Sequence, residues 1–134
     1  MIKPQRLEGS ELERTNAAAQ RAIGAAIEVH RHLGPGLLEA LYGTALSIEL
    51  DERRIPYAQQ VQIPALYKGR LLGNYFADFI VDDLVILEIK SVTAVLPVFK
   101  AQLMNYMQLT GKRLGLIMNF KSPLLKDGIE RVIL

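Results

Sequence analysis

Two charged residues, Glu88 and Lys90, stand in the most apolar stretch of the sequence, which runs from Leu84 to Val92. Side chains two residues apart in a β-strand point to the same face, so this carboxylate and this ammonium would lie side by side. Burying either charge alone would cost several kcal/mol or shift its pKa. The residue types leave three interpretations open: a structural ion pair, a strand end that has reached solvent, or a pair of groups held for chemistry.

Asp78 supplies a further carboxylate in a second apolar stretch, Tyr75–Val81. Asp82-Asp83 is typical of a tight turn, and antiparallel pairing about this turn would bring Asp78 close to Glu88 on the neighbouring strand. Facing carboxylates repel each other unless a cation lies between them, and two carboxylates with several waters suit Mg²⁺. Because a lysine beside such a site could position or deprotonate a water, the arrangement fits metal-assisted hydrolysis of a phosphodiester.

Two helices are expected before these strands. Apolar residues recur every three or four positions between Thr15 and Leu33, and Gly34-Pro35-Gly36 ends this helix. A second helix is expected from about Leu37 to Arg54, where Ile55-Pro56 stops it. Residues 1–14 are mostly polar, and we expect them to form a polar N-terminal segment that is frayed or loosely docked.

The remaining elements are strands with one helix among them. Strands are expected at residues 60–63, 71–81, 84–92, 114–120 and 128–134, and a helix at residues 98–110. Lys68-Gly69 is typical of a hairpin turn between the first two strands. The order α-α-β-β-β-α-β-β predicts an α/β fold of the mixed-sheet, α+β type, with a central mixed β-sheet flanked by helices. We expect a single domain over residues 15–134.

The composition excludes several classes of site. With no cysteine among 134 residues, the chain can form no disulfide, Cys-based zinc site, iron–sulfur cluster or thiol nucleophile. Lys and Arg number 16 against 14 Asp and Glu, and a net charge of +2 is not by itself a nucleic-acid signature. No apolar run is long enough for a membrane helix, and the first residues lack the apolar core of a signal peptide, so we expect no membrane association and a cytoplasmic location.

Two motifs resemble those of known families. Asp78, followed after one turn by Glu88-Ile89-Lys90, is similar to the core motif of the PD-(D/E)xK nuclease superfamily, although Ala77 stands where the name implies proline. The run Gly36-Leu37-Leu38-Glu39-Ala40-Leu41-Tyr42 resembles the pattern that names the GxxExxY family, which is placed in that superfamily. Residues 29–36, 101–106 and 115–120 are also similar to this family, so the resemblance covers roughly residues 16–134. It implies a restriction-endonuclease-like core.

The resemblance also implies roles for six residues. Asp78 and Glu88 would be metal ligands, with the backbone carbonyl of Ile89 as a third, and the metal would be Mg²⁺ or Mn²⁺. Lys90 would be the catalytic lysine. Two polar residues would complete the catalytic set: Glu39 as an additional acid that ligates or orients the metal site, and Gln102 as a polar group on the helix that follows the lysine strand.

Plainer interpretations stand beside these roles. Glu39 near a helix N-terminus would also be favoured by the helix dipole, and Tyr42 could either hydrogen-bond Glu39 or only pack. His30 lies on an apolar stripe and is expected in the core, whereas His32 is expected to be exposed. Several basic residues could contact phosphates only if they gather around the acidic site: Lys68, Arg70, Lys100, Lys112, Arg113 and Lys121.

Three functional hypotheses follow from the sequence. The first is a Mg²⁺-dependent nuclease that hydrolyses nucleic-acid phosphodiester bonds, with DNA as the expected nucleic acid, by means of a metal-activated water. The alternative is a non-catalytic module that keeps the fold and binds nucleic acid or a protein. The third is a purely structural pair, Glu88 and Lys90. A core of this size often needs a second copy to complete a substrate groove, so a homodimer stays open.

Overall fold

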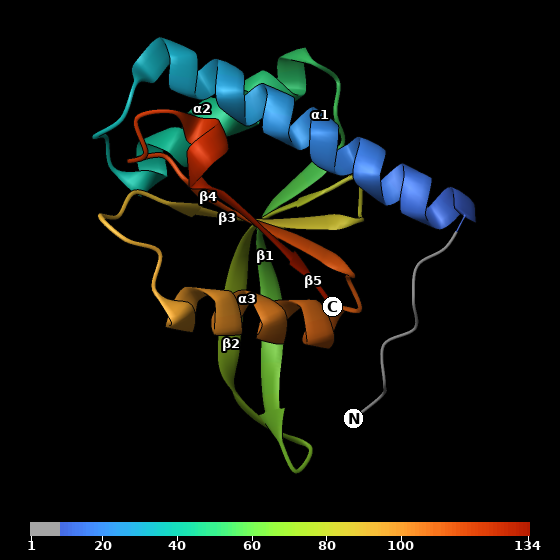
Figure 1. Ribbon diagram of the computed structural model, residues 1–134. Coiled ribbons are helices and arrows are strands. Elements are labelled where there is room, and N and C mark those ends of the chain that lie inside the picture. The colour runs from blue at the N-terminus through green and yellow to red at the C-terminus, as the bar shows by residue number, and fades with distance from the viewer. Residues whose placement is uncertain (1–8) are drawn as a thin grey trace.

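The computed structural model describes residues 9–134 (Figure 1). Its elements follow the predicted order: α1 (Gly9–Leu33), α2 (Glu39–Glu52), β1 (Tyr57–Tyr67), β2 (Arg70–Val81), β3 (Val85–Lys90), α3 (Pro97–Thr110), β4 (Leu114–Asn119), a short 3₁₀ helix η1 (Leu125–Gly128), and β5 (Ile129–Ile133).

The five strands form one mixed sheet in the order β1-β2-β3-β4-β5. Strands β3 and β4 are parallel and are joined by the crossover helix α3, whereas the other neighbours are antiparallel. Figure 1 shows α1 and α2 on one face of the sheet and α3 on the other. The predicted fold, a central mixed sheet flanked by helices, is therefore confirmed.

Small residues let the helices pack close to the sheet. On α1 five alanines are fully buried in the first core cluster: Ala18, Ala19, Ala22, Ala25 and Ala26. On the opposite face, a side chain at Gly115 of β4 would meet Leu103 of α3 at 2.9 Å, so glycine there permits the contact between α3 and the sheet. Two apolar clusters, one on each face, thus hold β3 and β4 at the centre of the sheet.

The first helix begins earlier than predicted. Residues 9–14 belong to α1, and Thr15 is a buried residue inside this helix. Residues 9–14 are therefore helical rather than frayed, and all of them are exposed; polar residues on the exposed side of a helix do not break it. Residues 1–8 of that expected segment lie outside the described residues.

Other boundaries also differ from the predictions. Helix α2 starts at Glu39 because Leu38 is extended, with φ −72° and ψ 149°. Strand β1 is much longer than residues 60–63, because it pairs with β2 along most of its length. Strand β3 ends at Lys90 rather than at Val92, whose backbone N–H and C=O bond instead to the side chain of Asn119.

Tyr42 packs and fixes the loop between the first two helices. Its hydroxyl donates to the carbonyl of Gly34 and accepts the N–H of Leu37, and its ring stacks on Phe120 with a centroid distance of 4.5 Å. The packing interpretation is confirmed, whereas the alternative hydrogen bond to Glu39 is not formed. Tyr42 thereby sets where α2 begins.

Tyr42→Phe is expected to lower the free energy of unfolding by about 1–2 kcal/mol. The substitution keeps the stacked ring but leaves the Gly34 carbonyl and the Leu37 N–H without their partner in a half-buried loop. Urea denaturation followed by circular dichroism measures the change. Tyr67→Phe is the control, because the Tyr67 side chain is exposed; an equal effect in both variants would contradict the bridging role.

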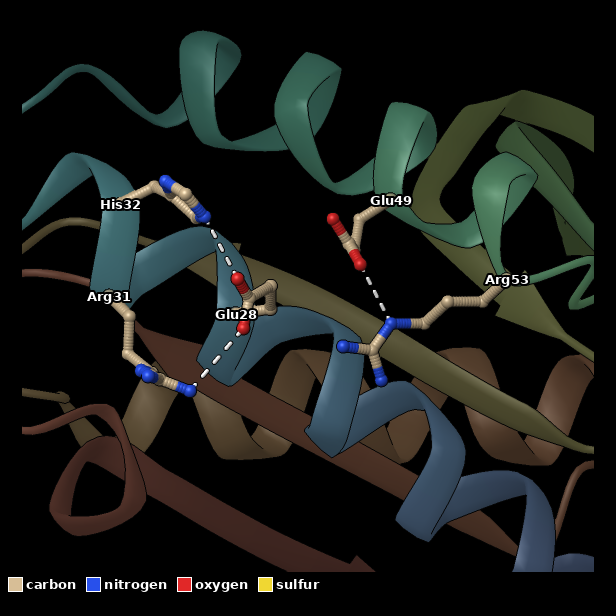
Figure 2. A network of polar contacts seen from close by, with 5 residues as sticks. All are labelled: Glu28, Arg31, His32, Glu49 and Arg53. Carbon is tan, nitrogen blue, oxygen red and sulfur yellow. Dashed lines mark hydrogen bonds and ion pairs between the residues drawn. The ribbon is translucent and has the colours of Figure 1, made fainter.

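Both histidine predictions are confirmed. His30 is buried, with Nε2 2.9 Å from the carbonyl oxygen of Ser122. His32 is exposed and pairs with Glu28, which also contacts Arg31, as Figure 2 shows beside the Glu49–Arg53 pair of α2. Exposed ion pairs of this kind contribute little to stability. The network in Figure 2 is therefore interpreted as part of the solvated helix surfaces.

Candidate active site

The sheet divides at Asp78. Strand β2 pairs with β3 only over residues 79–81, but it stays paired with β1 from residue 70 to residue 81. Phe79 packs in the cluster beneath α1 and α2, whereas Ala77 packs in the cluster beneath α3. Residues two apart in a regular strand face the same side of the sheet, so the regular alternation of side chains in β2 is interrupted at Asp78. Opposite it, Gln60 has a left-handed φ of +51°, which marks a local distortion at this point.

Asp78 and Glu88 are brought together as the turn predicts. Oδ2 of Asp78 accepts the N–H of Ile89 at 2.7 Å, and Oε1 of Glu88 accepts the N–H of Asp78 at 3.4 Å. The N–H and C=O of one residue in an extended strand point to the same side, so the Ile89 carbonyl also faces Asp78. Two carboxylates and one carbonyl thus gather where β2 leaves β3.

The electrostatics of this pair favour a bound cation. Glu88 is only 8% exposed, and burial, followed by repulsion from the Asp78 carboxylate, raises the pKa of Glu88 to about 9. The charge of Lys90 opposes this rise without cancelling it. Hard oxygen donors that repel one another are the donor set that Mg²⁺ and similar ions take. The residues present therefore fit a divalent ion.

Lys90 lies on the α3 side of the sheet. Its Nζ is 4.6 Å from the centroid of the Phe99 ring, a cation–π contact. Within residues 9–134 Lys90 and Glu88 form no ion pair, which contradicts the structural-pair interpretation. Tyr106 of α3 lies in the apolar cluster on the same face, and burial, followed by the Glu88 charge, raises the pKa of this tyrosine to about 12.

Glu39 reaches the site from the other face of the sheet. A cavity of about 370 Å³ is lined by Glu39, Gln60, Asp78 and Ile89, among others. Oε1 of Glu39 accepts the N–H of Ser91, the residue after Lys90, at 3.2 Å. In the described range 9–134, however, no three His, Cys, Asp or Glu side chains gather closely enough to hold a metal. Glu39 therefore lines the cavity without joining Asp78 and Glu88 in a three-carboxylate cluster.

Gln102 is not brought into contact with the carboxylates. Its side chain is exposed on α3 and forms no hydrogen bond with the residues the structure describes. Gln102 falls one helical turn after Phe99 and one turn before Tyr106, so it lies on the same side of α3 as these two residues.

The basic residues do not gather around the site. Lys112 pairs with Asp83 at the turn between β2 and β3, and Lys100 pairs with Glu130. Lys121 contacts Thr93, in the loop beyond β3. Lys68 and Arg70 flank the turn between β1 and β2, and Arg113 precedes β4. Among residues 9–134, a clustering of cations at the carboxylates is therefore not observed.

Three supporting residues escape sequence reasoning. Gln60 donates from Nε2 to Oδ1 of Asp78 at 3.4 Å, and the Ser91 hydroxyl donates to the carbonyl of Leu37 at 2.8 Å. Asn119 is buried and clamps the loop after Lys90 through both backbone groups of Val92. The only sequence signal was polarity at the ends of apolar strands, which is common in any sheet.

Comparison with known proteins identifies one family. A family model described as the PD-(D/E)XK nuclease superfamily matches residues 16–132, which include every candidate residue named above. Comparisons with curated proteins and with solved structures give no match. The narrower resemblance to the GxxExxY family stays a prediction.

Proposed function

The chain belongs to the PD-(D/E)XK nuclease superfamily, and on that premise we propose that it hydrolyses nucleic-acid phosphodiester bonds with a divalent metal ion. The observation that carries the proposal is the convergence of Asp78 and Glu88, where burial and mutual repulsion raise the pKa of Glu88 to about 9. Without a cation the pair avoids this repulsion because Glu88 keeps its proton up to about pH 9, and a divalent ion would take the place of that proton.

The metal ligands of the proposal are Asp78, Glu88 and the carbonyl of Ile89. Members of the superfamily generally use divalent metals, and we propose Mg²⁺ or Mn²⁺ for this chain. When bound, such an ion lowers the pKa of a coordinated water and neutralises charge on the phosphate. The N–H of Ile89 and the side chain of Gln60 hold Asp78 in place for this task.

Lys90 is proposed as the group that orients the attacking water or stabilises charge on the phosphate. Its ammonium is held over Phe99 rather than neutralised by Glu88, so it stays available to substrate. Glu39 is proposed to orient the cavity side of the site through Ser91, and Gln102 to contact substrate from α3.

DNA is the nucleic acid we propose, and a cytoplasmic location suits that substrate. Among residues 9–134 no helix combines the length and the apolar character needed to cross a bilayer. Sedimentation velocity would show whether the chain forms a homodimer.

The direct test is cleavage of single-stranded, double-stranded and branched DNA and RNA with Mg²⁺ or Mn²⁺. We expect cleavage of at least one of them, lost when EDTA removes the metal. No cleavage of any substrate, or cleavage that survives in Glu88→Ala, would overturn the proposal. Binding of nucleic acid without cleavage and without metal uptake would instead favour the non-catalytic module.

Asp78→Asn is expected to remove metal binding that wild type shows at millimolar Mg²⁺ or Mn²⁺. The amide keeps a hydrogen-bond acceptor for the N–H of Ile89 but gives up the negative charge between the two strands. Isothermal titration calorimetry measures the binding. Because Glu88 must lose its proton, wild-type affinity should also rise between pH 7 and pH 9.

Asp127→Asn, an exposed carboxylate at η1, is the control for the calorimetric titration. Metal binding that is equal in wild type, Asp78→Asn and Asp127→Asn would place the ion elsewhere.

A further inference from the structure

The hairpin of β1 and β2 extends from the candidate site past α3, as Figure 1 shows. Beyond Asp78 the two strands continue without β3 to the turn at Lys68 and Gly69. At a rise of about 3.3 Å per residue, this two-stranded ribbon reaches about 25 Å from the carboxylates. Its base carries Gln60 and Asp78, so the ribbon is a direct extension of the candidate site.

Between its base at Asp78 and the turn, the ribbon carries positive charge only. Residues 57–77 include Lys68 and Arg70 but no Asp or Glu, although the whole chain has nearly as many acids as cations. Lys68 and Arg70 flank the turn and are exposed, and neither forms an ion pair with any residue in the described range. The tip therefore presents two uncompensated cations to solvent.

Large apolar side chains surround these cations. Leu66, Tyr67, Leu71 and Leu72 are 60–70% exposed, and the Lys68 ammonium lies 5.4 Å from the Tyr67 ring centroid. Apolar groups gathered on an exposed hairpin indicate a binding surface. Beside cations, apolar side chains supply the contacts that proteins make with thymine methyl groups in the major groove.

We propose that the β1–β2 hairpin is an arm that grips duplex nucleic acid, with Lys68 and Arg70 on phosphates. This inference rests on the proposed function, since the arm would position a duplex at the carboxylates. A two-stranded ribbon fits the major groove of DNA, and the purely positive charge complements the phosphate backbone. A reach of about 25 Å corresponds to about seven base pairs at 3.4 Å each, so substrate must continue that far beyond the cleaved bond.

The test is fluorescence anisotropy of a labelled duplex of about 30 base pairs in metal-free buffer, where cleavage cannot occur. We compare wild type, Lys68→Ser/Arg70→Ser and a control with the same charge change at two exposed cations away from the hairpin, Arg14→Ser/Lys126→Ser. Losing two phosphate contacts should make the slope of log affinity against log salt concentration less negative by about two. The affinity lost by the tip variant should then be about tenfold larger at 50 mM than at 200 mM salt.

The control should keep the wild-type salt slope, and circular dichroism should show all three proteins folded. Equal slopes in both double variants, or no binding by wild type, would overturn the arm. A dimeric wild type would also overturn it if Leu66→Ser/Leu71→Ser were monomeric and bound the duplex with unchanged affinity. The hairpin would then bind a second copy of the chain. Tip-dependent binding without cleavage by wild type would reject the nuclease and keep the arm; cleavage with unchanged slopes would reject only the arm.

Discussion

Glu88→Gln is expected to lower cleavage by at least about 10³-fold while making the metal-free protein more stable at pH 8. Activity should fall because the amide cannot replace a carboxylate that faces Asp78 in a buried site. Stability should rise because glutamine has nearly the shape of a protonated glutamate and needs no proton to be buried. A gain of stability together with a loss of activity is the signature of a residue retained for chemistry.

The pH dependence follows from the direction of the pKa shift. The Glu88 carboxyl has an ordinary pKa of 4.5, and burial raises it to about 9 in the folded chain. Between these values the unfolded chain has lost the proton that the folded chain still holds, so the stability of wild type should fall as pH rises through this window. The fall amounts to several kcal/mol in total, and it should level off above about pH 9. Glu88→Gln removes this contribution.

Thermal denaturation of both proteins between pH 5 and pH 9, without metal, measures the difference. Glu13→Gln, at an exposed position of α1, is the control and should leave both activity and the pH profile unchanged. If Glu88→Gln is less stable than wild type at every pH, the carboxylate has a structural role, and its raised pKa does not govern the stability of the fold.

The Asp78–Glu88 pair could be predicted from the sequence because a tight turn fixes the register of a hairpin. Asp82 and Asp83 both have φ +55°, the conformation that such a turn requires, and the pairing of Val81 with Val85 follows from it. Only three pairs of residues separate the turn from the carboxylates, so small errors of register could not accumulate.

What the sequence could not indicate depends on contacts distant along the chain. The placement of Lys90 over Phe99 depends on how α3 crosses the sheet, and the contact of Glu39 with Ser91 depends on the loop that Tyr42 fixes. Strict alternation also fails at Gln60, where the strand is distorted beside the site. Local distortion of this kind is found where a site needs a particular side-chain direction, and periodicity cannot show it.

Lys90→Met is expected to lower cleavage by about 10²–10⁴-fold while metal binding is retained. Methionine preserves much of the apolar stem that packs against Phe99, but it removes the ammonium that would orient water or stabilise the phosphate. Rate measurements at saturating metal, with calorimetry on the same samples, separate the chemical step from metal uptake. The fold should survive, because Lys90 is half-buried at a strand end and forms no ion pair within residues 9–134.

Two controls make the Lys90 result specific. Lys126→Met removes an exposed cation from η1 and should leave cleavage unchanged. Phe99→Leu keeps an apolar contact but removes the ring beneath the ammonium, so cleavage should fall less than in Lys90→Met, because the charge remains but is less well held. Lower stability with wild-type activity in Lys90→Met would restore the structural interpretation of this pair. Loss of metal binding instead would show that the lysine maintains the ligand geometry, and the group that orients the water would then have to come from α3 or from the substrate.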